Sequence, residues 1–284
     1  MRTPMVSMLG LLLAVAMPAA AQPRVPDANA ATPQAIAGAL LDADIDQKAR
    51  ESLARDAAHR SADIVRALVD GLPDDEDEEY RRIPWIWRVA VAAGRSADDA
   101  VLKPLLDVSM PHDGDPLRDW QAVVLGGGIV MGLSQADRWP RDTMAPWLAE
   151  DATRARRWAR SLTLAATMAD DARVRNGTRY DALRMLAVVP WERAGALLVR
   201  YLSKDVDPEL QMGAIGGLGD LQDGRATTAL VTHMPQYTTR NRGLAVTALL
   251  RTDAGTAALR EAIARGTVPD AWLSEEQRQR LRRQ

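Results

Sequence analysis

Residues 209–229, ELQMGAIGGLGDLQDGRATTA, have the pattern of a helix, a tight turn and the start of a second helix. Ala214 and Leu218 are four residues apart, the spacing that places two side chains on one face of a helix. A Gly-Asp pair at 219–220 and an Asp-Gly pair at 223–224 then interrupt this pattern, as residues that favour turns do. We expect the stretch to form one helical hairpin.

The same apolar pattern occurs on both sides of this hairpin. An offset of 32 residues upstream matches Ala182, Leu186, Ala194 and Leu198 to Ala214, Leu218, Ala226 and Leu230, and an offset of 31 downstream matches Ala245 and Leu249 to the first two. A fixed period of helix–turn–helix units is typical of a stacked helical array. The sequence therefore predicts an all-α fold, an α-solenoid of stacked helical hairpins over residues 33–284.

The composition agrees with closely packed helices. Hydrophobic residues make up 47% of the 284 residues, but aromatic residues only 4%, with eight Trp and no Phe. Ala and Leu, which favour helices, must therefore fill most of the core. Long alternating runs of Val, Ile and Thr, which indicate strands, are missing. The formal net charge of −2 favours neither nucleic acid nor an anionic membrane surface as a partner.

The N-terminus resembles an export signal. Residues 1–21, MRTPMVSMLGLLLAVAMPAAA, combine one basic residue, an apolar run and a small-residue end. Ala19 and Ala21 fit the A-x-A cleavage pattern, so we expect a signal peptide over residues 1–21 and a mature chain from Gln22. The alternative is an uncleaved anchor, but the apolar run of residues 5–17 is too short to cross a bilayer of roughly 30 Å. Residues 22–32 are expected to be a flexible linker, and the mature product to be periplasmic or secreted, without a membrane span.

Several helices upstream of the repeats can be placed by their patterns. We expect helices over residues 33–41, 47–72, 83–93, 97–108 and 151–168, with Thr32 as the N-cap of the first and Pro84 in the first turn of the third. Trp85 falls on the apolar face of its helix and is expected to be buried. A run of three glycines at 126–128 lies inside an apolar stretch, which predicts the close approach of a neighbouring helix.

Residues with catalytic or metal-binding chemistry are sparse. The chain has no Cys, which excludes disulfides, thiolate zinc sites, iron–sulfur clusters and c-type haem attachment. None of the three histidines, His59, His112 and His233, has a carboxylate, nucleophile or second histidine at a motif spacing. The stretch around Ser134 lacks the final glycine of a nucleophile elbow. The sequence thus predicts no catalytic, cofactor-binding or metal-binding residue.

One helix offers weak candidates for a binding surface. Residues 151–168 carry Arg154, Arg157 and Arg160 beside an apolar stripe. These arginines have two interpretations, docking of an acidic partner or phosphate, or a solvated helix face partly paired with Asp151 and other acids. We take the three arginines as the binding candidates.

Five segments resemble a known family: IPWIWRVAVAAG, PLRDWQAVVLGGGIVMGLSQ, RYDALRML with PWERAGALL, ELQMGAIGGLGD, and NRGLAVTALLR. Over roughly residues 83–268 they are similar to the HEAT segment of large exported bacterial proteins of planctomycete and verrucomicrobial type. In that family the segment commonly lies between a dehydrogenase-type β-propeller and a C-terminal c-type cytochrome. The resemblance implies a scaffold within an exported redox assembly, although the repeat is shorter than the usual HEAT length of about 40–47 residues.

The chain departs from that family where the family's chemistry lies. No propeller precedes the helical segment, and no C-x-x-C-H haem motif is present. No haem-ligating or catalytic residue can therefore be transferred to this sequence.

Three functions remain open. The first is a non-catalytic scaffold that binds a protein partner along the array surface. The second is a haem-free subunit of a periplasmic dehydrogenase or electron-transfer complex, whose partners are a c-type cytochrome or a propeller dehydrogenase. The third is a hydrolase or lyase built on the helical array.

Overall fold

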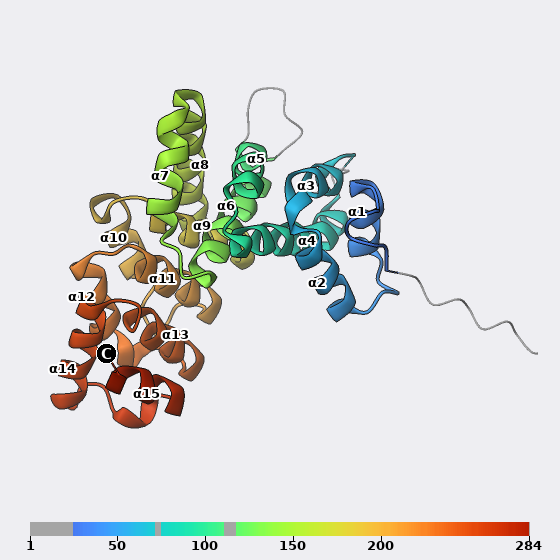
Figure 1. The fold of residues 1–284 in the computed structure, drawn as a ribbon. Helices are drawn as coiled ribbons and strands as arrows, with labels where there is room; N and C mark the ends of the chain where they lie inside the picture. Colours follow the sequence, from blue (N-terminus) through green and yellow to red (C-terminus); the bar gives the residue numbers. More distant parts are fainter. Residues whose placement is uncertain (1–24, 72–74, 111–117, 284) are drawn as a thin grey trace, which may run out of the picture.

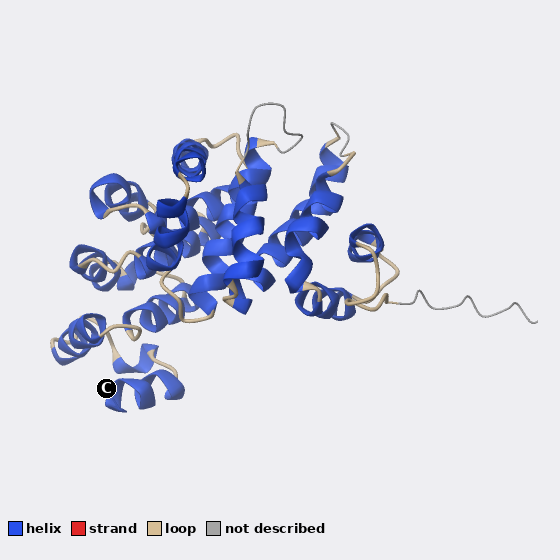
Figure 2. Ribbon diagram, turned by 45° about the horizontal axis from the view of Figure 1, so that its top comes forward, coloured by secondary structure: helices blue, strands red, loops and turns tan. Residues whose placement is uncertain are grey.

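The computed structural model describes residues 25–71, 75–110 and 118–283. This part of the chain contains α-helices, short 3-10 turns and loops but no strand, which confirms the all-α prediction (Figure 2). The helices are α1 (Pro33–Leu41), α2 (Gln47–Asp56), α3 (Ser61–Val69), α4 (Glu76–Ser96), α5 (Asp99–Ser109), α6 (Asp119–Gln135), α7 (Pro140–Glu150), α8 (Ala152–Asp170), α9 (Asn176–Met185), α10 (Trp191–Arg200), α11 (Pro208–Asp220), α12 (Gly224–Thr232), α13 (Thr239–Leu249), α14 (Asp253–Ala264) and α15 (Glu275–Arg283).

The helices follow one another along an arch, with α1–α3 near one end and α11–α15 at the other (Figure 1). Helices α4, α6, α9, α11 and α13 form one row, because each packs against the next. Helices α10, α12 and α14 form a second row behind the downstream half of the first. The α7–α8 hairpin stands out from the arch and is joined to it through contacts of α8 with α6 and α9.

The repeated apolar positions form the core of the downstream half. The repeats correspond to the hairpins α9–α10, α11–α12 and α13–α14. The ten residues matched by the repeat are all buried: Ala182, Leu186, Ala194, Leu198, Ala214, Leu218, Ala226, Leu230, Ala245 and Leu249. The apolar positions of the repeat therefore lie in the core, as their spacing predicted.

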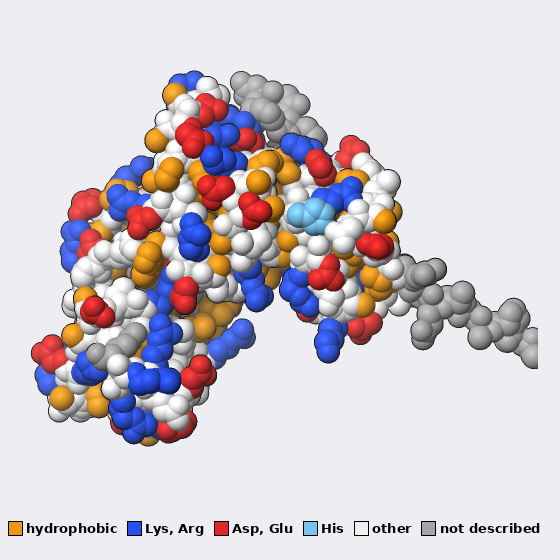
Figure 3. All heavy atoms as spheres, viewed as in Figure 1, with side chains coloured by type: hydrophobic (Ala, Val, Ile, Leu, Met, Phe, Trp, Pro, Cys, Tyr) orange, Lys and Arg blue, Asp and Glu red, His pale blue; other side chains and the backbone are white. Residues whose placement is uncertain are grey.

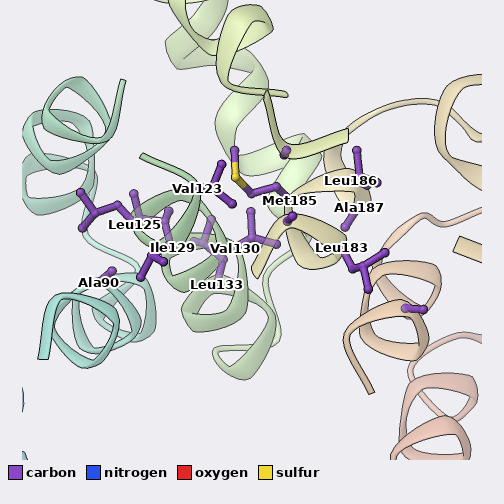
Figure 4. Close-up of a cluster of buried hydrophobic side chains, with 14 of the residues drawn as sticks. Ala90, Val123, Leu125, Ile129, Val130, Leu133, Leu183, Met185, Leu186 and Ala187 are labelled. Atoms are coloured by element: carbon purple, nitrogen blue, oxygen red, sulfur yellow. The ribbon is translucent and has the colours of Figure 1, made fainter. Parts of the chain in front are cut away.

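The three glycines of α6 allow two helices to approach it closely. A Cβ atom on Gly127 would lie 2.5 Å from the Cβ of Asp181 on α9, and one on Gly128 would lie 2.7 Å from the Cβ of Ala90 on α4. Figure 4 shows the core in which α4, α6 and α9 meet, with Ala90, Val130 and Met185 among its side chains. The expected close approach at the glycine run is confirmed, and it occurs on two sides.

Local hydrogen bonds explain most helix starts. The Thr32 hydroxyl accepts from the backbone N–H of Ala35 at the start of α1, as expected. At the start of α15, Ser274 and Gln277 exchange side-chain-to-backbone bonds in a capping box. Trp85 is buried, as predicted.

Two expectations about helix limits were wrong. The helix expected over residues 47–72 is two helices, because the chain turns through the 3-10 segment Ala58–Arg60. Both helices pack on α1 and α4, and α3 packs also on α5. Helix α4 starts seven residues before the predicted start, capped by Asp75, and contains Pro84 in its interior.

The N-terminal predictions meet the structure only in part. The predicted signal peptide, residues 1–21, lies outside the described residues. Within the stretch assigned to a linker, Ala28 packs into the hydrophobic core. In the portion of the chain that the structure describes, no helix has the length and hydropathy needed to cross a bilayer.

Candidate functional site

The arginines of α8 hold this helix against the end of α5. Arg154 binds both carboxylate oxygens of Asp107, at 2.7 and 3.0 Å, and donates to the carbonyl of Trp147 at 3.1 Å. Arg157 donates to the carbonyls of Asp107, at 3.0 Å, and Met110. Asp107 raises the pKa of Arg154 through these hydrogen bonds. Arg154 thus holds α5 through the Asp107 carboxylate, and Arg157 holds it through carbonyls at its C-terminus, which carry partial negative charge.

Arg157 also lines a cleft of about 740 Å³ between α8 and the N-terminal helices. The wall opposite Arg157 comes from α1 and α3 and carries Asp63 and Arg66. These two side chains form an ion pair at 2.8 Å, and both are more than half exposed (Figure 3 shows the charged surface of the arch). Arg160 is exposed on α8 and does not line the cleft. Arg154 and Arg157 thus hold α5, whereas the side chain of Arg160 is exposed.

A second set of charges lies toward the opposite end of the arch and is largely buried. We call it the charge ladder: Ser134 of α6, Arg184 of α9, Asp220 of α11, and Arg251, which follows α13. Asp220 accepts hydrogen bonds from Arg184 at 2.6 Å, from the Ser134 hydroxyl at 2.9 Å, and from Arg251. The side chains of Arg184 and Asp220 are 3% and 1% exposed, and that of Arg251 is 10% exposed.

Small residues and one indole ring position the charge ladder. Gly216 leaves space for Arg184, since a Cβ there would lie 2.0 Å from a guanidinium nitrogen. The Arg251 guanidinium stacks on Trp139, 4.1 Å from the ring centroid. With its amide oriented to satisfy both neighbours, Gln222 accepts from the Trp139 indole N–H at 3.0 Å and donates to Asp142 at 3.2 Å.

Arg251 and Trp139 line a second cleft of about 400 Å³, which we call the turn cleft. It lies between the α11–α12 and α13–α14 hairpins at their turns. Its lining includes apolar Leu218, Leu230 and Leu249 as well as polar Thr227, Asp223 and Asp253. Its volume falls within the roughly 300–1,000 Å³ of small-ligand sites, and a few polar groups are placed around it.

A second buried carboxyl lies where α4, α6 and α9 meet. Asp181 accepts a hydrogen bond from the indole N–H of Trp87 at 2.9 Å and is 4% exposed. Burial raises the pKa of Asp181 well above its usual value, although the Trp87 hydrogen bond and the Arg184 charge oppose this effect. Asp181 therefore has a neutral hydrogen-bond donor, whereas Asp220 has two cationic ones.

The serine and histidines singled out in the sequence have structural surroundings. The hydroxyl of Ser134 donates to Asp220 from within α6, not from a strand-to-helix elbow. The Nδ1 of His233 lies 2.9 Å from the Ala229 carbonyl, and His59 is exposed. His112 lies outside the described residues. Within those residues, no three His, Asp or Glu side chains converge in a way that could hold a metal ion.

The charge ladder was missed by the sequence interpretation, although the repeat contains a signal for it. Arg251 follows Asp220 by 31 residues, and Gly216 follows Arg184 by 32, the two repeat offsets. Equivalent positions of stacked units lie side by side. An acid followed one period later by an arginine therefore predicts an ion pair between neighbouring hairpins, and a glycine one period after an arginine predicts room for its side chain.

Comparisons with known proteins assign no family. No family model and no curated protein matches the chain. A crystal structure of an engineered protein from the Northeast Structural Genomics Consortium is 16% identical, with 88% of this chain and 94% of that chain covered, at a TM-score of 0.37.

Proposed function

We propose that this protein is an exported, non-catalytic scaffold, an α-solenoid of HEAT-like hairpins that binds a protein partner along its surface. The proposal joins the export signal expected from residues 1–21 to the repeated hairpins of the downstream half. Stacked helical arrays present extended surfaces, which they commonly use to bind other proteins.

The observation that carries the proposal is the single continuous core. One hydrophobic cluster extends from Ala28 to Leu281 and connects the helices along the whole arch. Such a core keeps distant hairpins in fixed relative positions, because protein interiors are close-packed and transmit strain. A partner bound at several hairpins would therefore meet a preformed surface, which lowers the entropic cost of binding.

The test is capture of a partner followed by direct measurement of binding. The mature chain, residues 22–284 with a C-terminal tag, is used to recover proteins from a periplasmic extract of its source, and these are identified by mass spectrometry and stained for haem. Each candidate is then purified, and its dissociation constant is measured by interferometry. A saturable, one-to-one interaction supports the scaffold proposal. No binding by any purified candidate contradicts it, and turnover of a hydrolase or lyase substrate by the chain alone would contradict its non-catalytic part.

The α8 surface can be tested in the same assay. Arg160→Ala removes an exposed guanidinium and leaves the clamps of Arg154 and Arg157 on α5 intact. We expect a weaker interaction if α8 is part of the interface. An unchanged dissociation constant removes this position from the interface without affecting the rest of the proposal.

A further inference from the structure

The turn cleft has a cationic end. Arg251 lines the cleft, and its guanidinium is held between the Trp139 ring and Asp220. An arginine side chain has five N–H donors. Arg251 makes three hydrogen bonds within the described residues, to Asp220, to the Ser134 hydroxyl at 3.3 Å and to the Arg138 carbonyl at 3.4 Å. The guanidinium is thus fixed in place and retains capacity to donate to a further acceptor.

The charges around Arg251 favour an additional anion. Two guanidinium groups, those of Arg184 and Arg251, share the single buried carboxylate of Asp220. A further counter-charge, the Asp137 carboxylate, lies 3.6 Å from Nε of Arg251, but it is 81% exposed, so that solvent screens most of its effect. A buried cation with incomplete compensation attracts an acceptor that carries negative charge.

Two carboxylates, those of Asp223 and Asp253, also line the turn cleft. Asp223 is paired with Arg225 at 2.8 Å, whereas Asp253 is exposed and has no ion pair among the described residues. The two carboxylates would therefore repel a polyanion. A ligand with one anionic and one cationic group matches both Arg251 and Asp253.

We propose that the turn cleft binds a peptide segment of the protein partner that presents a carboxylate to Arg251 and a basic side chain to Asp253. This inference rests on the proposed function, because it specifies which partner chemistry the scaffold recognises. The intervening part of the peptide contacts the accessible apolar lining, which is formed by Trp139, Ala248 and the exposed Ala254. Charge-assisted hydrogen bonds of the arginine provide orientation as well as affinity.

The probes are three capped peptides: acetyl-Lys-Ala-Ala-Glu-amide, the same peptide with Gln in place of Glu, and the same peptide with Gln in place of Lys. Each is titrated to about 10 mM into the ¹⁵N-labelled mature chain, since short peptides bind weakly. The readout is the indole N–H resonance of Trp139, assigned with Trp139→Phe. We expect a saturable shift with the first peptide and binding about tenfold weaker when Glu becomes Gln, because a charge-assisted hydrogen bond is lost.

Matched variants locate the binding. Ala254→Trp places a bulky ring at an exposed position that lines the turn cleft, and Ala257→Trp places the same ring one turn further along α14, outside the lining. The first should abolish the Trp139 shift and the second should leave it unchanged. Asp253→Asn should remove the preference for Lys over Gln while the preference for Glu remains.

Three outcomes would overturn the inference: no saturable shift with any peptide, equal binding of the Glu and Gln peptides, or unchanged binding by Ala254→Trp. Failure here is distinguishable from failure of the scaffold proposal. If a purified partner binds the wild type and Ala254→Trp equally well, the scaffold proposal survives and the turn cleft is not its binding site.

Discussion

Two buried aspartates, 39 positions apart, show how differently neighbouring parts of this arch are held together. Asp181 lies upstream, among α4, α6 and α9, and accepts a hydrogen bond from the neutral indole of Trp87. Asp220 lies downstream and accepts from two guanidinium groups and a hydroxyl. The upstream contact is surrounded by glycines and aliphatic side chains, and the downstream one by charges.

The comparison shows that the effect of burying a carboxyl group depends on the hydrogen-bond donors around it. With cationic donors, a buried carboxylate becomes a link that is strongly destabilising to break. With a neutral donor, the same group is driven toward its protonated form, and its pKa rises. The two aspartates should therefore respond differently to substitution.

The largest effect is expected for Asp220→Ala. It leaves Arg184 and Arg251 buried beside each other without their shared counter-charge. The free energy of unfolding, measured by urea denaturation, should fall by about 3–5 kcal/mol. Asp137→Asn is the control, because it removes the charge of an 81% exposed partner of the same Arg251 and keeps a residue type that tolerates the left-handed φ of 56° at this position. It should change stability by less than about 1 kcal/mol. Similar losses in the two variants would show that the charge ladder is not a buried link.

The next effect tests the glycine packing that surrounds Asp181. In Gly127→Ala the new Cβ would lie 2.5 Å from the Cβ and 2.7 Å from the Cα of Asp181, so backbone must move. We expect a loss of about 1–3 kcal/mol in the free energy of unfolding. Gly38→Ala adds the same methyl group to α1, where no atom lies within 4 Å. It should gain about 0.5–1 kcal/mol from helix propensity, and stabilisation by both substitutions would contradict close packing at α6.

A smaller effect is expected at the α8 clamp, which is partly exposed. Arg154→Ala removes the bidentate contact with Asp107, whose side chain is 41% exposed. Thermal or urea unfolding should show a loss of about 1–2 kcal/mol. Arg156→Ala, at an exposed position where the guanidinium contacts Thr153, should stay within about 0.5 kcal/mol of the wild type. If Arg154→Ala is equally silent, the contact of Arg154 with Asp107 does not stabilise α8.

The last prediction concerns the pH dependence that Asp181 gives to the free energy of unfolding. Its folded-state pKa is raised, so its contribution to stability is complete below the unfolded pKa of about 3.9 and is lost as pH rises through the folded value. Asp181→Asn keeps an acceptor for Trp87 and cannot ionise. Urea midpoints measured from pH 4 to 8 should therefore decline less steeply with pH in this variant than in the wild type. Asp205→Asn, at an exposed position, should reproduce the wild-type slope, and a wild-type slope in Asp181→Asn would contradict the prediction.

The sequence alone determined the helical class and the downstream core. A pattern of small and apolar residues at two nearly equal offsets fixes which faces of successive hairpins are buried, because each unit repeats the contacts of the previous one. The glycine run likewise predicted a close helix contact, since a glycine inside a helix is otherwise destabilising. Local pattern was less informative at the upstream helix limits, where the turn at residues 58–60 and the interior Pro84 depend on the helices packed around them.

Only the tertiary structure decided which polar residues share a site. Arg154 and Arg157 have the pattern of a solvent-facing helix, but the end of α5 approaches them and uses their donors. Trp139 precedes α7, Asp220 ends α11 and Arg251 follows α13, and Trp87 and Asp181 are 94 residues apart. Spacing along a helix reports only which face a side chain occupies, whereas burial, pKa and hydrogen-bonding capacity depend on what packs against that face.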